Sequence, residues 1–241
     1  MSQSSNTAPP KRGVDDAIAA FAAGRPVLIH DAADREGEVD LVYPAASVDS
    51  DAVARMRNDA GGLVCVALAD DVCERWELPF MQEVVDHPAG ASHELGYDER
   101  SSFSLTVNHR DTFTGITDED RALTISKIGE AAASVRRASE IAGDAAEDAI
   151  APDAEAFAQQ FRAPGHVHLL RAAPDLLDDR KGHTELGLVL AAAADVEPAV
   201  VVCEMMDDES GGALSPAAAR TYADRHGLAY VEGSELIARL G

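Results

Sequence analysis

The alternation of short apolar runs with helical patterns constrains the fold of this chain most strongly. Buried strands are expected at apolar runs rich in β-branched residues, such as RPVLIHD, GLVCVAL, AVVVCEMM and LAYVE. Helical spacing occurs between them, as in VDDAIAAFAAG and SDAVARMRNDAGG, and each of these helical patterns ends in glycine. Strands that alternate with helices favour a sheet covered on both faces. We therefore predict an α/β fold of the α+β type, a three-layer α/β/α sandwich around a mixed β-sheet.

The same alternation continues through the second half of the chain. The segment SSFSLTVNHRD alternates like a half-buried strand, and Thr117 and Asp120 have capping-box spacing before a long amphipathic helix. A strand at HVHLLRAA, a helix at HTELGLVLAAAAD and a helix opened by Ser215 and Pro216 follow in order. Every element predicted from these patterns fits one continuous sheet with its helices.

The remaining segments set the domain boundaries. Residues 70–100 are polar and look irregular, and residues 143–157 look like an acidic, alanine-rich connection. The N-terminal MSQSSNTAPPKRG lacks the apolar segment of a signal peptide. We predict a single domain over residues 14–241, preceded by a disordered lead-in over residues 1–13.

The charge of the chain narrows the classes of function. Its 241 residues contain 43 Asp and Glu against 20 Lys and Arg, which gives a formal net charge of -23. Such a chain is unsuited to nucleic acid or to an anionic membrane, because both require a basic surface, and no apolar run is long enough to span a bilayer. Three cysteines without a C-x-x-C motif suit a reducing compartment. We expect a halophilic cytoplasmic protein with small or cationic partners.

An acidic triplet is the first candidate site. Glu36, Glu38 and Asp40 stand at every second position of DAADREGEVDLVYPA. In an extended chain these side chains point to the same face, where they would suit a hard metal ion or acid/base chemistry. A chain this acidic contains about one such triplet by chance, so an ordinary acidic surface is the alternative.

A loop that leads into a helix is the second candidate site. Free backbone N–H groups, the positive end of a helix dipole and two cations suit a phosphate group, and these features meet at Arg180, Lys181, Gly182 and Thr184. An ordinary capped helix start is the alternative. His183 lies in the same loop. Beside Glu36 or Glu38 it would complete a nitrogen and oxygen site for Mg²⁺ or Mn²⁺.

Two more residues are candidates for proton transfer. His166 follows a Pro-Gly turn at the mouth of a strand and is the stronger acid/base candidate, whereas His168, on the same strand face, is interpreted as structural. Glu204 ends the apolar strand AVVVCE. It is either a carboxylate that has simply reached solvent or a proton shuttle.

Six motifs together resemble one enzyme family. DREGEVDLVYPA, GGLVCVAL, TFTGITDEDRALTI, APGHVHLLRA, KGHTELGLVLAAAA and VVVCEMMDDESGGALS occur in the order and spacing of 3,4-dihydroxy-2-butanone 4-phosphate synthase, and the match runs from about Asp15 to Leu240. The resemblance implies a lyase of riboflavin biosynthesis that converts D-ribulose 5-phosphate into 3,4-dihydroxy-2-butanone 4-phosphate and formate. It also implies Mg²⁺, with Mn²⁺ as a substitute, a single-function enzyme, and a homodimer with the active site near the subunit interface.

The resemblance also assigns roles to the candidate residues. Glu36 and His183 match the metal ligands, and His166 and Glu204 match the histidine and the glutamate regarded as essential for catalysis. We add Glu38 to the catalytic residues, and we assign it to the substrate hydroxyls together with Asp40. The positions implied to bind substrate are Arg35, Glu36, Asp40, Arg180, Lys181, Gly182, His183, Thr184 and Glu204.

Some positions depart from the family pattern, and two other classes of function stay open. Gly37 and Val39 replace the asparagine and glycine of the common R-E-N-E-G-D motif, and Lys181 stands where glycine is common. A sugar-phosphate aldolase or phosphatase would use the same phosphate loop and carboxylates, and the one-carbon product separates these enzymes. A non-catalytic cation-binding protein would need the acidic charge but no specific set of His183, His166 and Glu204.

Overall fold

The computed structural model describes residues 12–31, 35–90, 100–142 and 152–241. Residues 1–11 of the predicted lead-in lie outside the described residues. Gly13 donates its backbone N–H to the carbonyl of Tyr230 at 3.0 Å, immediately before the first helix begins at Val14.

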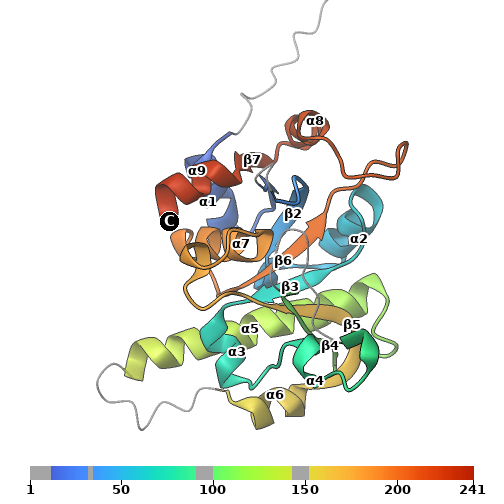
Figure 1. The fold of residues 1–241 in the computed structure, drawn as a ribbon, viewed down its shortest axis with the longest axis vertical. Helices are drawn as coiled ribbons and strands as arrows, with labels where there is room; N and C mark the ends of the chain where they lie inside the picture. The colour runs from blue at the N-terminus through green and yellow to red at the C-terminus, as the bar shows by residue number, and fades with distance from the viewer. Residues whose placement is uncertain (1–11, 32–34, 91–99, 143–151) are drawn as a thin grey trace, which may run out of the picture.

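Seven strands of the described residues form one sheet in the order β4-β5-β3-β6-β2-β1-β7 (Figure 1). The strands are β1 Val27–His30, β2 Val39–Pro44, β3 Cys65–Leu68, β4 Phe103–His109, β5 Phe161–Arg171, β6 Ala199–Glu204 and β7 Ala229–Glu232. The β1–β7 and β3–β5 pairs are parallel, and the other four pairs are antiparallel. The predicted mixed sheet is therefore confirmed.

Helices cover both faces of this sheet. They are α1 Val14–Ala22, α2 Ser50–Asp59, α3 Asp70–Arg75, α4 Met81–Val84, α5 Asp118–Ala142, α6 Ala154–Gln160, α7 His183–Ala193, α8 Pro216–His226 and α9 Gly233–Leu240, with short 3-10 turns at Ala45–Ser47, Pro88–Gly90 and Leu176–Asp178. Each helix of the described residues is too short or too polar to cross a membrane.

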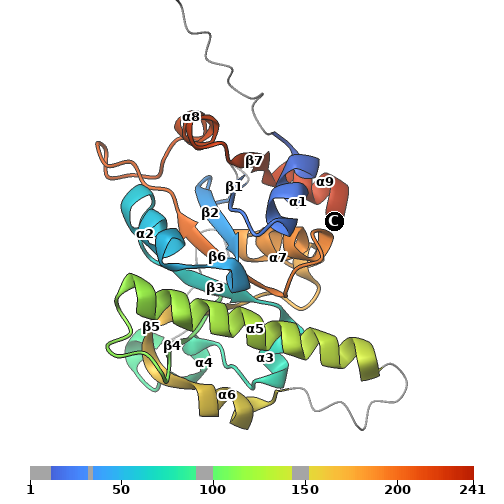
Figure 2. The same cartoon turned by 180° about the vertical axis from the view of Figure 1, so that it is seen from behind.

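Alternate strand residues fill two separate cores. Leu41 and Cys203 pack with residues of α2, α3, α5, α6 and α8, whereas Val42 and Cys65 pack with residues of α1, α7 and α9. Figure 2 shows α5 lying along one face of the sheet, whereas α1, α7 and α9 lie next to one another and apart from α5. The two-residue period of each strand thus directs side chains into both layers. The predicted three-layer α/β/α sandwich is confirmed.

Local signals fix several helix ends as predicted. The hydroxyl of Thr117 accepts the backbone N–H of Asp120 at 3.1 Å before α5, and the hydroxyl of Ser215 accepts that of Ala218 at 3.3 Å in α8. Gly24, just after α1, has a φ of 68°, a left-handed conformation that glycine adopts without strain. These caps satisfy backbone groups that a helix end leaves without partners.

Three helices lie in segments that we interpreted as irregular. Helices α3 and α4 fall within residues 70–100, and α6 begins within the acidic connection, so these interpretations were wrong for the helical residues. Each helix has at most seven residues, which is too short to give a clear helical period. Residues 91–99 and 143–151 lie outside the described residues.

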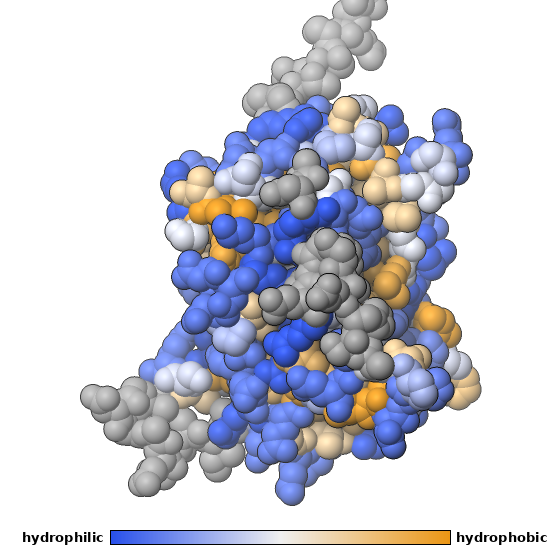
Figure 3. All heavy atoms as spheres, in the orientation of Figure 1, coloured by the Kyte–Doolittle hydropathy of each residue, from blue (hydrophilic) through white to orange (hydrophobic). Residues whose placement is uncertain are grey.

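The acidity of the chain predicts a strong effect of salt on its stability. Figure 3 shows a face dominated by hydrophilic residues, and the net charge of -23 makes the folded chain repel itself. We expect the thermal unfolding midpoint to rise by about 4–8 °C between low and molar KCl, as a gain of about 2 kcal/mol would produce. Calorimetry at a series of KCl concentrations measures this shift. An unchanged midpoint would contradict the halophile prediction.

Candidate active site

One pocket, of about 430 Å³, lies where the sheet meets the N-terminus of α7. Its walls combine carboxylates, arginines, hydroxyl groups and an apolar floor from the sheet: Glu36, Glu38, Asp40, Glu204, Arg35, Arg100, Arg180, His183, Thr184, Ser101, Ser102, Cys65, Phe103, Leu170 and Val202. A pocket with an apolar floor and converging charged groups is the usual form of a small-molecule site.

The acidic triplet lines this pocket with all three of its carboxylates. Only Asp40 lies in a strand, where it pairs with Glu204 of the antiparallel strand β6. The chain turns before β2 at Gly37, whose φ of 67° favours glycine. Glu36 lies in that turn. The side chains therefore meet in one pocket as the alternation suggested, although the segment is not extended throughout.

His183 lies between two of these carboxylates. Its Nδ1 is 3.5 Å from Oε2 of Glu36, and its Nε2 is 3.6 Å from Oδ1 of Asp40. The residue is only 6% exposed. Nε2 of His183 and Oδ1 of Asp40 are buried without a hydrogen-bond partner in the described part of the chain. Because an unsatisfied buried polar atom is costly, these two atoms are suited to a ligand.

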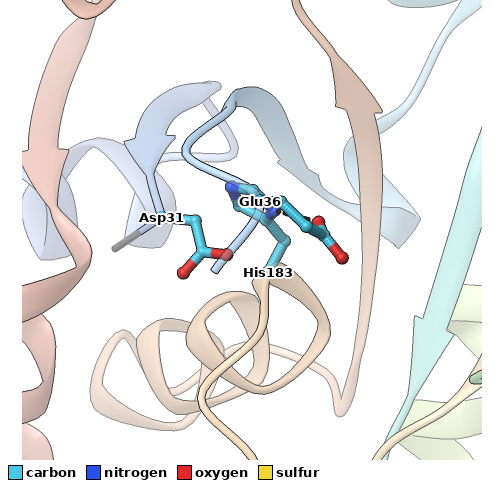
Figure 4. Close-up of side chains that lie close together, drawn as sticks. All are labelled: Asp31, Glu36 and His183. Carbon is cyan, nitrogen blue, oxygen red and sulfur yellow. Dashed lines mark ion pairs between the residues drawn. The ribbon is translucent and has the colours of Figure 1, made fainter. Parts of the chain in front are cut away.

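Asp31 joins Glu36 and His183 in a cluster of donor atoms (Figure 4). One ligand atom from each residue lies within 4.8 Å of the other two, and Asp31 is buried at the end of β1. Two carboxylates and an imidazole fit a hard divalent cation such as Mg²⁺ or Mn²⁺. The sequence interpretation missed Asp31. Its position directly after an apolar strand, the same signal that singled out Glu204, would have identified it.

Burial and crowding shift the ionisation of the cluster. Burial raises the pKa of Asp40 and of Glu38, and the neighbouring Glu36 and Glu204 raise both further. The contact with His183 lowers the pKa of Glu36. Burial alone would lower the pKa of His183, but the surrounding carboxylates outweigh it and raise that pKa to about 9. A site that concentrates negative charge in this way favours a bound cation.

Two arginines converge beside the helix start. A Cβ atom on Gly182 would lie 2.5 Å from Nη1 of Arg180 and 3.1 Å from Nη2 of Arg35, so any larger residue would displace the Arg180 guanidinium group from its present position. Thr184, in the first turn of α7, is buried and lines the same pocket. Guanidinium groups beside a helix N-terminus form a cradle for a phosphate group.

The structure separates two of the predicted residues from this cradle. Lys181 is exposed and does not line the pocket. His166 is also exposed, and β3 lies between its strand β5 and the strand of Glu204. The backbone N–H of His166 donates to Oδ1 of Asn108 at 2.8 Å. Within one chain, the pocket therefore contains Glu204 without His166.

Glu185 is a buried carboxylate that supports the cradle from behind. Its Oε2 accepts hydrogen bonds from Nη1 of Arg180 at 2.9 Å and from the backbone N–H of Gly182 at 3.3 Å. Its Oε1 accepts the backbone N–H of Ala173 at 3.1 Å. Glu185 thus fixes both the loop and the Arg180 side chain, a positioning role that we did not predict from the sequence.

Replacing Glu185 by glutamine should therefore destabilise the fold and loosen the cradle. Glutamine has one acceptor oxygen, so a group that Glu185 now satisfies loses its partner and the Arg180 ion pair is lost. We expect a loss of about 2–4 kcal/mol in the free energy of unfolding, measured by urea denaturation. Glu155→Gln, on the exposed side of α6, is the matched control and should change little. Equal stability of the two variants would contradict this account.

Known proteins resemble this chain over nearly its whole length. A family model described as 3,4-dihydroxy-2-butanone 4-phosphate synthase matches residues 15–239. The synthase of Methanosarcina mazei is 45% identical over 234 residues, which cover 93% of this chain and 89% of that protein. The synthase of Archaeoglobus fulgidus is 44% identical over 232 residues, which cover 92% of each chain.

Solved structures agree with the sequence relatives. A crystal structure of 3,4-dihydroxy-2-butanone 4-phosphate synthase in complex with two magnesium ions has a TM-score of 0.74 and 29% identity, and the match covers 94% of this chain and 95% of that one. The two-domain synthase RibBX of A. baumannii has a TM-score of 0.71 and 31% identity, over 93% of this chain and 56% of that one. With this fold, this pocket and these relatives, the chain belongs to the 3,4-dihydroxy-2-butanone 4-phosphate synthase family of riboflavin biosynthesis.

Proposed function

We propose that the protein is a cytoplasmic lyase that converts D-ribulose 5-phosphate into 3,4-dihydroxy-2-butanone 4-phosphate and formate. One observation carries the proposal: a single pocket contains Glu36 and His183 of the donor cluster together with the arginine cradle around Gly182. A sugar phosphate needs both, a cradle for its phosphate and polar groups around its reacting carbons.

The cluster would hold the divalent ion. Glu36 and His183 are the proposed ligands, and Asp31 offers a third donor atom. The solved synthase with two magnesium ions supports Mg²⁺ as the ion. We propose Mn²⁺ as a substitute, because it suits the same oxygen and nitrogen donors. When bound, the ion would stabilise negative charge on neighbouring substrate oxygens during enolisation. The unsatisfied Nε2 of His183 and the mixed oxygen and nitrogen donors fit such an ion.

The other residues of the pocket would bind the substrate and move protons. Arg35, Arg180 and Thr184 would hold the phosphate at the start of α7. Enolisation, loss of water at C1, skeletal migration and release of C4 as formate require several proton transfers, for which we propose Glu204 and Glu38. Asp40, beside Glu204, would bind a substrate hydroxyl.

We also propose a homodimer with the pocket near the subunit interface. Exposed apolar side chains stand in the loop that follows β4, where Phe113 is 93% exposed and Ile116 is 52% exposed. The carboxylate of Asp120 fixes this loop by accepting backbone N–H groups from residues 113–115. The loop also adjoins His166, because Asn108 contacts both His166 and the carbonyl of Thr114. A second copy on this face would cover Phe113 and bring His166 to the interface.

Light scattering after gel filtration tests the dimer. The chain should elute with twice its monomer mass, and Phe113→Asp should shift it toward the monomer, because an interface cannot readily bury the new charge. Val84→Asp, at an exposed site on α4, is the matched control. A monomeric parent protein would overturn the dimer.

Product analysis tests the reaction itself. Purified protein supplied with ribulose 5-phosphate and Mg²⁺ should release formate and leave the phosphate esterified. Inorganic phosphate as the product would indicate a phosphatase, and two larger fragments would indicate an aldolase. Either result would overturn the proposed function.

A further inference from the structure

The pocket has a third arginine, Arg100, which lies outside the phosphate loop in the sequence. Arg100 and the two serines that follow it line the pocket together with Arg180 and Thr184. The carbonyl of Ser102 accepts the backbone N–H of Arg171 at 2.9 Å, which fixes this segment at the end of β5. Just beyond that strand, Ala173 donates its N–H to Glu185 of α7. The end of β5 therefore anchors both the Arg100 segment and the phosphate loop.

A buried aromatic ring holds the guanidinium group of Arg100. Its Cζ lies 3.6 Å from the ring centroid of Phe80, and the Cζ of Arg171 lies 4.7 Å from the same centroid. Ion pairs with Asp70 and Glu74 hold Arg171 in place. A guanidinium group that stacks on a ring keeps its N–H donors free at its edge.

Those donors are available to a ligand. Within the residues that the structure describes, Arg100 donates no hydrogen bond, and its only ion pair is a 3.6 Å contact between Nη1 and Oε1 of Glu83. The two side chains of that pair are 49% and 59% exposed, so solvent screens the contact. The other two pocket arginines already contact carboxylates, Arg35 with Asp31 and Arg180 with Glu185.

We propose that Arg100 binds the phosphate group of the substrate, together with Arg180, through its free guanidinium N–H groups. This inference rests on the proposed function, because it takes ribulose 5-phosphate as the substrate. A phosphate dianion entering a pocket lined by four carboxylates needs positive charge that is not already paired. Arg100 supplies that charge, and the Phe80 platform limits the entropy lost when the side chain is ordered.

Equilibrium binding tests Arg100 without requiring turnover. Calorimetry at fixed ionic strength, in the presence of Mg²⁺, gives the Kd of inorganic phosphate for the full chain and for Arg100→Gln. A lost charge-assisted hydrogen bond should raise this Kd by about 10- to 100-fold. The KM for ribulose 5-phosphate should rise by a similar factor, with kcat little changed. Arg225→Gln removes the same charge from the exposed surface of α8 and should leave all three values within about twofold of the parent.

Different results separate the failure of this inference from the failure of the proposed function. If Arg100→Gln binds phosphate as tightly as Arg225→Gln does, Arg100 does not bind the phosphate. If KM rises while the Kd of phosphate is unchanged, Arg100 contacts the sugar, and the inference is also overturned. If the parent protein binds phosphate in an Arg100-dependent manner but releases no formate, the proposed reaction fails and the phosphate contact stands.

Discussion

Replacing His183 by alanine is expected to abolish turnover while leaving the fold intact. His183 lies at the first residue of α7, between Glu36 and Asp40, where it contributes a proposed metal ligand and little to the apolar core. We expect kcat/KM to fall by about 10³-fold or more and the affinity for divalent ions to fall by about 10- to 100-fold. Steady-state kinetics, Mn²⁺ titration and thermal unfolding measure the three quantities.

The matched control for this variant is His226→Ala. His226 is exposed at the end of α8, where it stacks on Tyr222 outside the pocket. It should retain parental activity and ion affinity. A folded His183→Ala protein with normal activity would remove His183 from the site, and a folded protein with normal ion affinity would remove it from the metal ligands.

Replacing Glu204 by glutamine should have an effect of similar size through a different step. The amide keeps the shape of the side chain at the end of β6 but cannot transfer a proton. We expect kcat to fall by about 10²- to 10⁴-fold while the Kd of ribulose 5-phosphate stays within a few fold. Single-turnover kinetics and equilibrium binding with Ca²⁺ in place of Mg²⁺ measure the two separately.

The exposed loop after β6 offers the control for Glu204. Glu209→Gln makes the same chemical change on an exposed side chain that does not line the pocket, so both constants should match those of the parent. An equal loss of binding and turnover in Glu204→Gln would instead indicate that Glu204 anchors the substrate.

Sequence patterns predicted the fold well because most of its strands and helices are marked by residues within or next to them in the sequence. Apolar runs such as AVVVCEMM and GLVCVAL indicate buried strands by their composition alone. Capping residues such as Thr117 and Ser215 likewise mark helix starts without reference to distant residues. Helix α6 was missed because six of its seven residues are alanine, glutamine or glutamate, a composition that resembles a solvated connection. The stacking of Phe157 on Trp76 and Phe161 is what shows that α6 is packed against the fold and is not a solvated connection.

The site was less predictable, because its geometry depends on strand order. Asp40 and Glu204 meet because β2 pairs with β6, and His166 stays apart from Glu204 because β3 lies between their strands. Sequence spacing contains neither fact. Asp31 was one of 43 acidic residues until β1 brought it within reach of His183. The role of Glu185 likewise emerged only from its hydrogen bonds to the loop that it supports.

The fate of one carbon atom tests the central claim most directly. Ribulose 5-phosphate labelled with ¹³C at C4 should yield labelled formate in the carbon NMR spectrum, with the phosphate still attached to the four-carbon product. The phosphate ester should survive because the Arg180 loop binds the phosphate group equally in the ground state and the transition state, and so positions the substrate without promoting loss of its phosphate. A chelator should stop formate release, and added Mg²⁺ should restore it. Label that remains in a five-carbon sugar, or formate that appears equally without metal, would contradict the account.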